Sequence, residues 1–144
     1  GCRFKSDNRL HSVYMHTKLK GDIGQLLVAA EIMARGWHIA LPYGENLKYD
    51  LIAEKNGILK RIQVKAVIPK NGALHINCRS SNNWSVVHYS PKDFEILAAV
   101  DLQSKKVYFI PSERMHRNLI NLRLIPSKNY QKKNINFADK FLNF

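Results

Sequence analysis

Hydrophobic and polar positions alternate in two different ways along the chain. Most of the sequence has the period of two that is typical of half-buried strands, and it predicts strands at residues 37–41, 48–55, 58–67, 74–80, 86–89, 95–101 and 106–111. Residues 22–35 instead carry apolar side chains at helical spacing and are followed by Gly36, so they predict an α-helix. The apolar stripe of that helix comprises Ile23, Leu26, Leu27, Ala30, Met33 and Ala34.

The two ends of the chain carry weaker patterns. Residues 1–18 show little periodicity and predict an N-terminal arm, so we expect residues 19–144 to form a single domain with a C-terminal helical extension. A chain of this length can bury about two-thirds of its unfolded surface. Residues 111–117 predict a helix that opens at Pro111. Residues 134–144 predict a docking helix with Phe137, Phe141 and Leu142 on one face.

A predicted hairpin brings three polar side chains together. Asn56-Gly57 lies between two strand patterns, and this dipeptide favours a two-residue turn because both positions adopt positive φ. Counting back along both strands from such a turn sets Asp50 opposite Gln63. Directly opposed side chains lie about 5 Å apart at Cβ, and Lys65 points to the same side of the sheet. A carboxylate, an amide oxygen and an ammonium group at one point suit a divalent cation held beside a water molecule and a phosphate.

This hairpin resembles the core of the PD-(D/E)xK nucleases, in which Asp on one strand is followed by Asp, Glu or Gln, any residue and Lys on the next. A longer stretch, residues 20–117, is similar to the restriction-fold homing endonucleases that group I introns encode. In that branch a helix opening with Lys-Gly-Asp-x-Gly-Glu precedes a strand ending near Pro, and Tyr-Asp-Leu and Gln-x-Lys strands follow. The matching residues are Lys20, Gly21, Asp22, Gly24, Pro42, Tyr49-Asp50-Leu51 and Gln63-Val64-Lys65, and residues 94–111 are similar to the later strands.

The resemblance implies an α/β fold with a restriction-endonuclease-like core: a central mixed sheet flanked by helices, with the catalytic β-hairpin at residues 48–67. It implies that Asp50, Gln63 and the Val64 backbone carbonyl hold Mg²⁺ or Mn²⁺, with Ca²⁺ as a non-catalytic substitute, while Lys65 acts on the attacking water. The family's acid on the first helix is Gln25 here, which would also face the metal. Gln keeps the shape and one oxygen but loses the charge, so metal binding and catalysis are expected to be weaker.

Position 25 has two interpretations. Under the resemblance, Gln25 marks either a protein altered to trap bound DNA or a natural loss of activity. Alternatively, Asp22 and Gln25 are spaced as the partners of a capping box, with Asp22 as the helix N-cap and Gln25 at the third helical position. Both interpretations stay open on the sequence.

Composition favours a nucleic-acid partner. The chain has 23 basic and 11 acidic residues, for a formal charge of +12, and each half divided at residue 72 carries +6. A basic RNA-binding protein would show the same balance. The sequence has two cysteines, Cys2 and Cys78, no zinc-type spacing and no apolar run of membrane length. We therefore expect a soluble, cytoplasmic protein with no membrane partner.

Two groups of residues are candidates for DNA contact. Arg and Asn pair with base edges in the major groove, and a solvated strand face would have the same polar pattern. The candidates for base contact are His75, Asn77 and Arg79 on one strand face, followed by Asn82 and Asn83. The candidates for phosphate contact, from a stretch without acids, are Arg114, Arg117, Arg123, Lys128, Lys132 and Lys133.

Together these features predict a sequence-specific double-stranded DNA endonuclease that acts in intron homing by magnesium-dependent phosphodiester hydrolysis, with activity impaired by Gln25. Cutting both strands with one small site per chain needs a second copy, so we expect a homo-oligomer, either a dimer or a tetramer. Two alternatives stay open. One is a Holliday-junction resolvase-like nuclease, and the other is a catalytically inactive DNA-binding module, which the neutral Gln25 and Gln63 favour.

Overall fold

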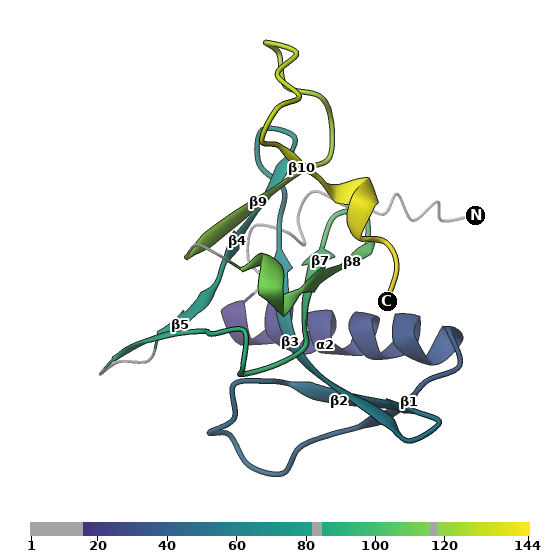
Figure 1. Ribbon diagram of the computed structural model, residues 1–144. Helices are drawn as coiled ribbons and strands as arrows, with labels where there is room; N and C mark the ends of the chain where they lie inside the picture. The colour runs from purple at the N-terminus through teal and green to yellow at the C-terminus, as the bar shows by residue number, and fades with distance from the viewer. Residues whose placement is uncertain (1–15, 82–84, 116–117) are drawn as a thin grey trace, which may run out of the picture.

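The computed structural model describes residues 16–81, 85–115 and 118–144. One long α-helix lies along one face of a five-stranded sheet, and a smaller sheet packs against the other face (Figure 1). The large sheet is mixed, because β3 and β7 are parallel while its other neighbouring strands are antiparallel. This confirms the predicted mixed α/β fold. The sheet has the order β1 (His38–Ala40), β2 (Leu51–Lys55), β3 (Ile58–Val67), β7 (Ile96–Asp101) and β8 (Val107–Pro111).

The helix α2 runs over Thr17–Ala34 and begins five residues earlier than predicted. Its N-cap is His16, whose ring Nδ1 accepts a hydrogen bond from the Lys18 backbone N–H at 3.3 Å. Asp22 therefore lies inside the helix, and the capping-box interpretation of Asp22 and Gln25 is wrong. The helix also includes the last two residues of the predicted arm, and residues 1–15 lie outside the described part of the chain.

The buried face of α2 differs from the predicted stripe. Its buried residues are Gly24, Val28 and Ile32, spaced by four, while Leu26 and Met33 are 71% and 59% exposed. A Cβ atom at Gly24 would lie 2.7 Å from the Cβ of Ala66, so the helix backbone meets β3 directly at this point. Glycine has no side chain, so it lets the helix approach the strand closely. The spacing of apolar residues in the sequence does not reveal such a contact.

The predicted hairpin is confirmed. β2 pairs antiparallel with β3 and Leu51 faces Ile62, which sets Asp50 opposite Gln63. The turn residues Asn56-Gly57 have φ values of +53° and +79°, as the two-residue turn requires. The first strand is shorter than predicted, since β2 begins at Leu51 rather than at residue 48.

A second sheet covers the opposite face of β7 and β8. Along the predicted strand at 74–80, Leu74, Ile76 and Cys78 are buried as the alternation requires. The chain there divides into two strands, one in this sheet and one in a two-stranded ribbon. The three-stranded sheet contains β4 (Ala73–Asn77), β9 (Leu119–Arg123) and β10 (Asn136–Phe137), and the ribbon contains β5 (Arg79–Ser81) and β6 (Val86–His88).

The C-terminal part of the chain is less helical than predicted. The helix predicted at 111–117 is a single 3₁₀ turn, η1 (Ser112–Arg114), and the docking helix at 134–144 is β10 followed by the 3₁₀ turn η2 (Ala138–Phe141). β10 pairs in parallel with β9, so its backbone groups take part in strand pairing and not in a helix. The last residue, Phe144, packs its ring edge-on at 5.0 Å from both Trp37 and Phe109. Within the described residues, no helix is both long and apolar enough to cross a bilayer.

Candidate active site

Asp50 immediately precedes β2, and hydrogen bonds tie it to β3. The backbone N–H of Val64 donates to Asp50 Oδ2 at 2.8 Å, and the Asp50 N–H donates to the Ile62 carbonyl at 2.8 Å. Burial raises the pKa of the Asp50 carboxyl, although the Val64 N–H and the nearby Lys65 ammonium act against this rise. A partly buried carboxylate whose charge is only partly offset favours a cation beside it.

Gln63 is the most buried polar side chain of the predicted site, with 8% of its surface exposed. Its Nε2 donates to the Val64 carbonyl at 3.3 Å. The carboxamide can also turn so that its oxygen faces that carbonyl. Because two acceptors repel each other, a cation has to lie between them for this orientation to be favourable. The Gln63 side chain therefore lies beside the Val64 carbonyl, and these two groups are both among the predicted metal ligands.

Lys65 lies two residues further along β3, with its side chain against the ribbon. Its Nζ donates to the Arg79 carbonyl at 3.1 Å and lies 5.1 Å from the ring centroid of Tyr89. Burial lowers the pKa of Lys65, although the carboxylate of Asp50 acts against this fall. The ammonium group is thus anchored and more acidic than that of a surface lysine. Tyr89 was not predicted as a site residue, since its contact with Lys65 depends on how the ribbon folds onto β3.

A cavity of about 290 Å³ is lined by residues from both the helix and the start of the hairpin. Gln25 from α2 and Asp50 both line it, so the structure brings together the predicted residues from these two elements. Neither Gln63 nor Lys65 is among the residues that line it. The rest of the lining comes from Tyr49 and from the loop between β1 and β2, namely Leu41, Pro42, Gly44, Glu45 and Leu47.

The donors at this site fit a hard cation. Within the described residues, no group of three His, Cys, Asp or Glu side chains could hold a metal. The available donors are the carboxylate of Asp50, the carbonyl of Val64 and the amide oxygens of Gln63 and Gln25. All of them are oxygen atoms, which suits Mg²⁺, Mn²⁺ or Ca²⁺ and does not suit a zinc site built from Cys and His.

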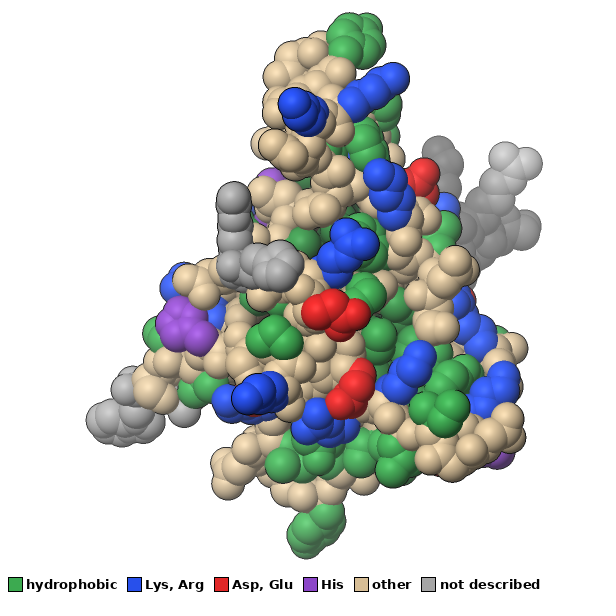
Figure 2. Space-filling view, in the orientation of Figure 1, with side chains coloured by type: hydrophobic (Ala, Val, Ile, Leu, Met, Phe, Trp, Pro, Cys, Tyr) green, Lys and Arg blue, Asp and Glu red, His purple; other side chains and the backbone are tan. Residues whose placement is uncertain are grey.

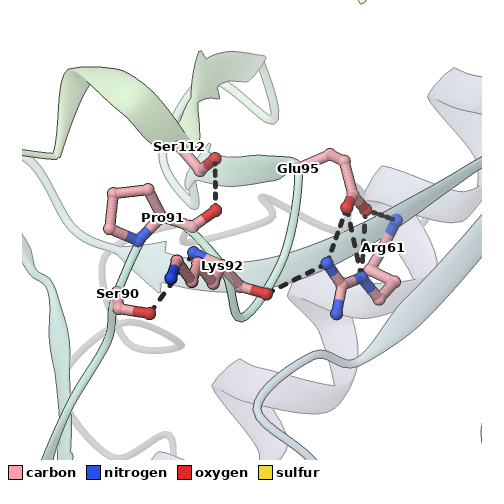
Figure 3. A network of polar contacts seen from close by, with 6 residues as sticks. All are labelled: Arg61, Ser90, Pro91, Lys92, Glu95 and Ser112. Atoms are coloured by element: carbon pink, nitrogen blue, oxygen red, sulfur yellow. Dashed lines mark hydrogen bonds and ion pairs between the residues drawn. The ribbon is translucent and has the colours of Figure 1, made fainter.

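A network of polar contacts anchors the strand that carries Gln63 (Figure 3). Both the backbone N–H and the guanidinium of Arg61 donate to the carboxylate of Glu95, at 2.6 and 2.7 Å, and the guanidinium also donates to the Lys92 carbonyl at 3.0 Å. The Ser112 hydroxyl donates to the Pro91 carbonyl at 3.1 Å. These contacts fasten the turn at 90–93 and the start of β7 to β3, two residues before the buried glutamine of the site.

The predicted base-contact residues that the structure describes are all exposed. His75 and Asn77 are exposed on β4, and Arg79 is exposed on β5. The His75 ring pairs with the Asn121 carboxamide of β9 through Nδ1 and Oδ1 at 2.8 Å, a partner that the sequence did not indicate. Asn82 and Asn83 lie outside the described residues.

The predicted phosphate-contact residues Arg114, Lys128, Lys132 and Lys133 are all exposed, while Arg117 lies outside the described residues. Figure 2 shows Lys and Arg side chains scattered from the protruding loop at the top of the view to the hairpin region below. The remaining predicted phosphate-contact residue, Arg123, binds the backbone of the protein itself. Arg123 donates to the carbonyls of Asn71, Ile125 and Pro126.

Comparisons with known proteins were made for the whole chain. A model described as PD-(D/E)XK endonuclease matches residues 15–144, which include α2 and the hairpin. Among solved structures, a bacterial homing endonuclease, I-Ssp6803I, is similar with a TM-score of 0.70. It is 27% identical in sequence, and the match covers 88% of each chain. No curated protein matches the sequence.

Proposed function

The chain belongs to the PD-(D/E)XK endonuclease family, and we propose that it is a sequence-specific endonuclease of the intron-homing type that hydrolyses double-stranded DNA with Mg²⁺. The observation that carries the proposal is the hydrogen bond from Val64 to Asp50, which holds a carboxylate opposite Gln63 and close to Lys65. The likeness to a bacterial homing endonuclease over most of both chains supports the homing type.

The residues of the hairpin would have different roles in the reaction. Asp50, Gln63 and the Val64 carbonyl would hold the metal ion, and Gln25 would face it across the cavity. When bound, the ion would acidify a water molecule and offset the negative charge that grows on the phosphate. The other groups of the site position the water, the phosphate and the proton that has to leave.

Lys65 is the group proposed to handle that proton. Burial lowers its pKa, so its amine can accept a proton from water more readily near neutral pH than a surface lysine can. In the step, a water oxygen forms a bond to phosphorus while the bond to the leaving oxygen breaks, and the proton of the water passes to Nζ. The resulting ammonium then stabilises the charge on the phosphate oxygens.

DNA binding would use the exposed face of β4 and the ribbon for bases and the dispersed basic residues for phosphates. A formal charge of +12 supports a partner with a regular array of negative charges. One chain offers one hairpin site, so cutting both strands calls for a homo-oligomer that places two sites on the duplex. Affinity should fall steeply with salt, because each phosphate contact releases a counterion.

A catalytically inactive DNA-binding module is the second candidate. Two of the four proposed catalytic positions, Gln25 and Gln63, carry neutral amides, which leaves Asp50 as the one carboxylate among them. A metal ion that prefers anionic oxygen would bind such a site weakly. This candidate predicts salt-sensitive DNA binding without cleavage.

The two candidates can be separated with the chain as given and the Gln25→Glu variant. Each is incubated with pooled linear genomic DNA and, separately, with a four-way junction, in Mg²⁺ or in excess chelator. We expect metal-dependent cuts at a few discrete duplex sites, faster with Gln25→Glu. Cleavage of the junction alone would assign a resolvase-like nuclease. DNA retained without cleavage by either form would assign the binding module.

A further inference from the structure

We infer that Glu45 supplies a second carboxylate to the metal site and so takes the place of the acid that position 25 lacks. The inference rests on the proposed metal-dependent function of the hairpin. It concerns a residue of the loop between β1 and β2, which also contains Asp50, whereas Gln63 and Lys65 lie on β3 and Gln25 lies on α2.

The position of Glu45 is the first support. Glu45, Gln25 and Asp50 line the same cavity of about 290 Å³, with Gln25 on the helix and Glu45 on the loop. A cation held by Asp50 at this cavity would therefore be within reach of donors from both the loop and the helix. A glutamate side chain has three rotatable bonds, and Glu45 is exposed, so its carboxylate can turn toward the cation without moving the backbone.

The backbone before Glu45 is specialised. Gly44 has a φ of +96°, a conformation that favours glycine, although a Cβ there would meet no atom within 4 Å. The requirement for glycine at this point is therefore conformational rather than steric. The chain changes direction at the residue that precedes Glu45.

The carboxylate of Glu45 is also uncommitted. Within the described residues it makes no hydrogen bond or ion pair. Two other acids, in contrast, have partners: Asp93 pairs with Lys48 at 3.1 Å, and Glu95 pairs with Arg61 at 2.7 Å. In a strongly basic protein, a carboxylate left unpaired beside a cavity is available to a cation that enters it.

The charge of the site gives the chemical reason. Asp50 alone provides one negative charge to a divalent ion, and the neutral amides at positions 25 and 63 provide no further charge. Hard divalent cations prefer anionic oxygen, so a second carboxylate raises affinity substantially. Because Gln25 and Glu45 line the same cavity, moving the carboxylate from one to the other should largely preserve binding.

The test uses Mn²⁺ alone, titrated into the full chain, with unbound Mn²⁺ measured by electron paramagnetic resonance. Four variants are compared with the chain as given: Glu45→Gln, the double variant Gln25→Glu with Glu45→Gln, Asp50→Asn, and Glu113→Gln. The last removes an equal charge from η1, away from the cavity, and serves as the matched control. Thermal unfolding of each variant checks that the fold is intact.

We expect Glu45→Gln to weaken Mn²⁺ binding by at least the roughly tenfold that even an outer partner of a metal ligand contributes. The double variant should recover most of that loss, and Glu113→Gln should bind as the chain does. If Glu45→Gln matched Glu113→Gln while Asp50→Asn bound more weakly, the role of Glu45 would be overturned and the proposed site would stand. If Asp50→Asn had no effect, both would be overturned.

Discussion

The contact between α2 and β3 at Gly24 allows a sharp prediction about the substitution Gly24→Ala. The new methyl group would lie 2.7 Å from the Cβ of Ala66 and 3.4 Å from Cγ1 of Val64. Carbon atoms in contact are normally about 3.5–4.0 Å apart. The helix would therefore have to retreat from the strand by about 1 Å at this point.

Two opposing terms set the change in stability. Overpacking of this kind costs about 1–3 kcal/mol, while replacing glycine by alanine inside a helix stabilises by about 1 kcal/mol. We expect the free energy of unfolding to fall by up to about 2 kcal/mol. Activity should fall further, because Gln25 follows Gly24 and a displacement of about 1 Å at a reacting site can lower the rate about a hundredfold.

The chain offers a matched control for this substitution. Gly21 lies in the same helix, and a Cβ there would meet no atom within 4 Å. Gly21→Ala should therefore stabilise the protein by about 0.5–1 kcal/mol through helix propensity alone. A second change, Ala66→Gly, removes the atom that the new methyl would strike, so it should partly rescue Gly24→Ala beyond the sum of the single effects.

The assays are urea unfolding for stability and metal-dependent cleavage in the Gln25→Glu background for activity. The predicted order of stability is Gly21→Ala above the parent chain and Gly24→Ala below it. The reasoning would be refuted if Gly24→Ala stabilised the protein as much as Gly21→Ala and kept full cleavage. That result would mean that the helix does not rest on β3 at Gly24.

Lys65→Ala should abolish cleavage and leave DNA affinity, measured by fluorescence anisotropy, within a few-fold; full cleavage would remove Lys65 from the mechanism. Because burial lowers the pKa of Lys65 from 10.5, the cleavage rate should rise with pH and level off below pH 10.5, and a rate that kept rising up to pH 10.5 would contradict this. Arg61→Gln should cost no more than about 1 kcal/mol at pH 7, since both partners are over a third exposed. Hydrogen bonding to Arg61 lowers the pKa of Glu95, so this pair stabilises above pH 4.5 and its contribution should be lost as the pH falls through the lowered value; a constant difference in urea unfolding would contradict it. Sedimentation at near-physiological salt should show a homo-oligomer, against which a mass of 16.6 kDa would count.

The hairpin could be predicted because its determinants are local. Asn56-Gly57 specifies a turn with two positive φ values, and the turn length then sets the register of every residue pair behind it. The pairing of Asp50 with Gln63 therefore follows from a dozen consecutive residues. The alternation of Leu74, Ile76 and Cys78 was equally local and equally correct.

The errors lie where distant contacts decide the structure. The buried face of α2 depends on where Ala66 of β3 allows close approach, so Leu26 remained exposed although it fits a helical stripe. Strand β9 was not predicted, because its edges pair with β4 and β10 from distant parts of the sequence. The contacts of Lys65 with Tyr89 and the place of Glu45 at the cavity likewise depend on tertiary packing.

The central claim, that the hairpin is a metal-dependent site for DNA cleavage, is tested most directly through Asp50. Pooled genomic DNA is incubated with Mg²⁺ and the Gln25→Glu variant, with and without Asp50→Asn, and the new DNA ends are sequenced while DNA affinity is measured in parallel. Asp50→Asn removes one negative charge but keeps an oxygen that can accept the Val64 hydrogen bond. The account predicts discrete cuts that disappear with Asp50→Asn while DNA affinity is kept. Cuts at the same sites and rate in both forms would contradict it.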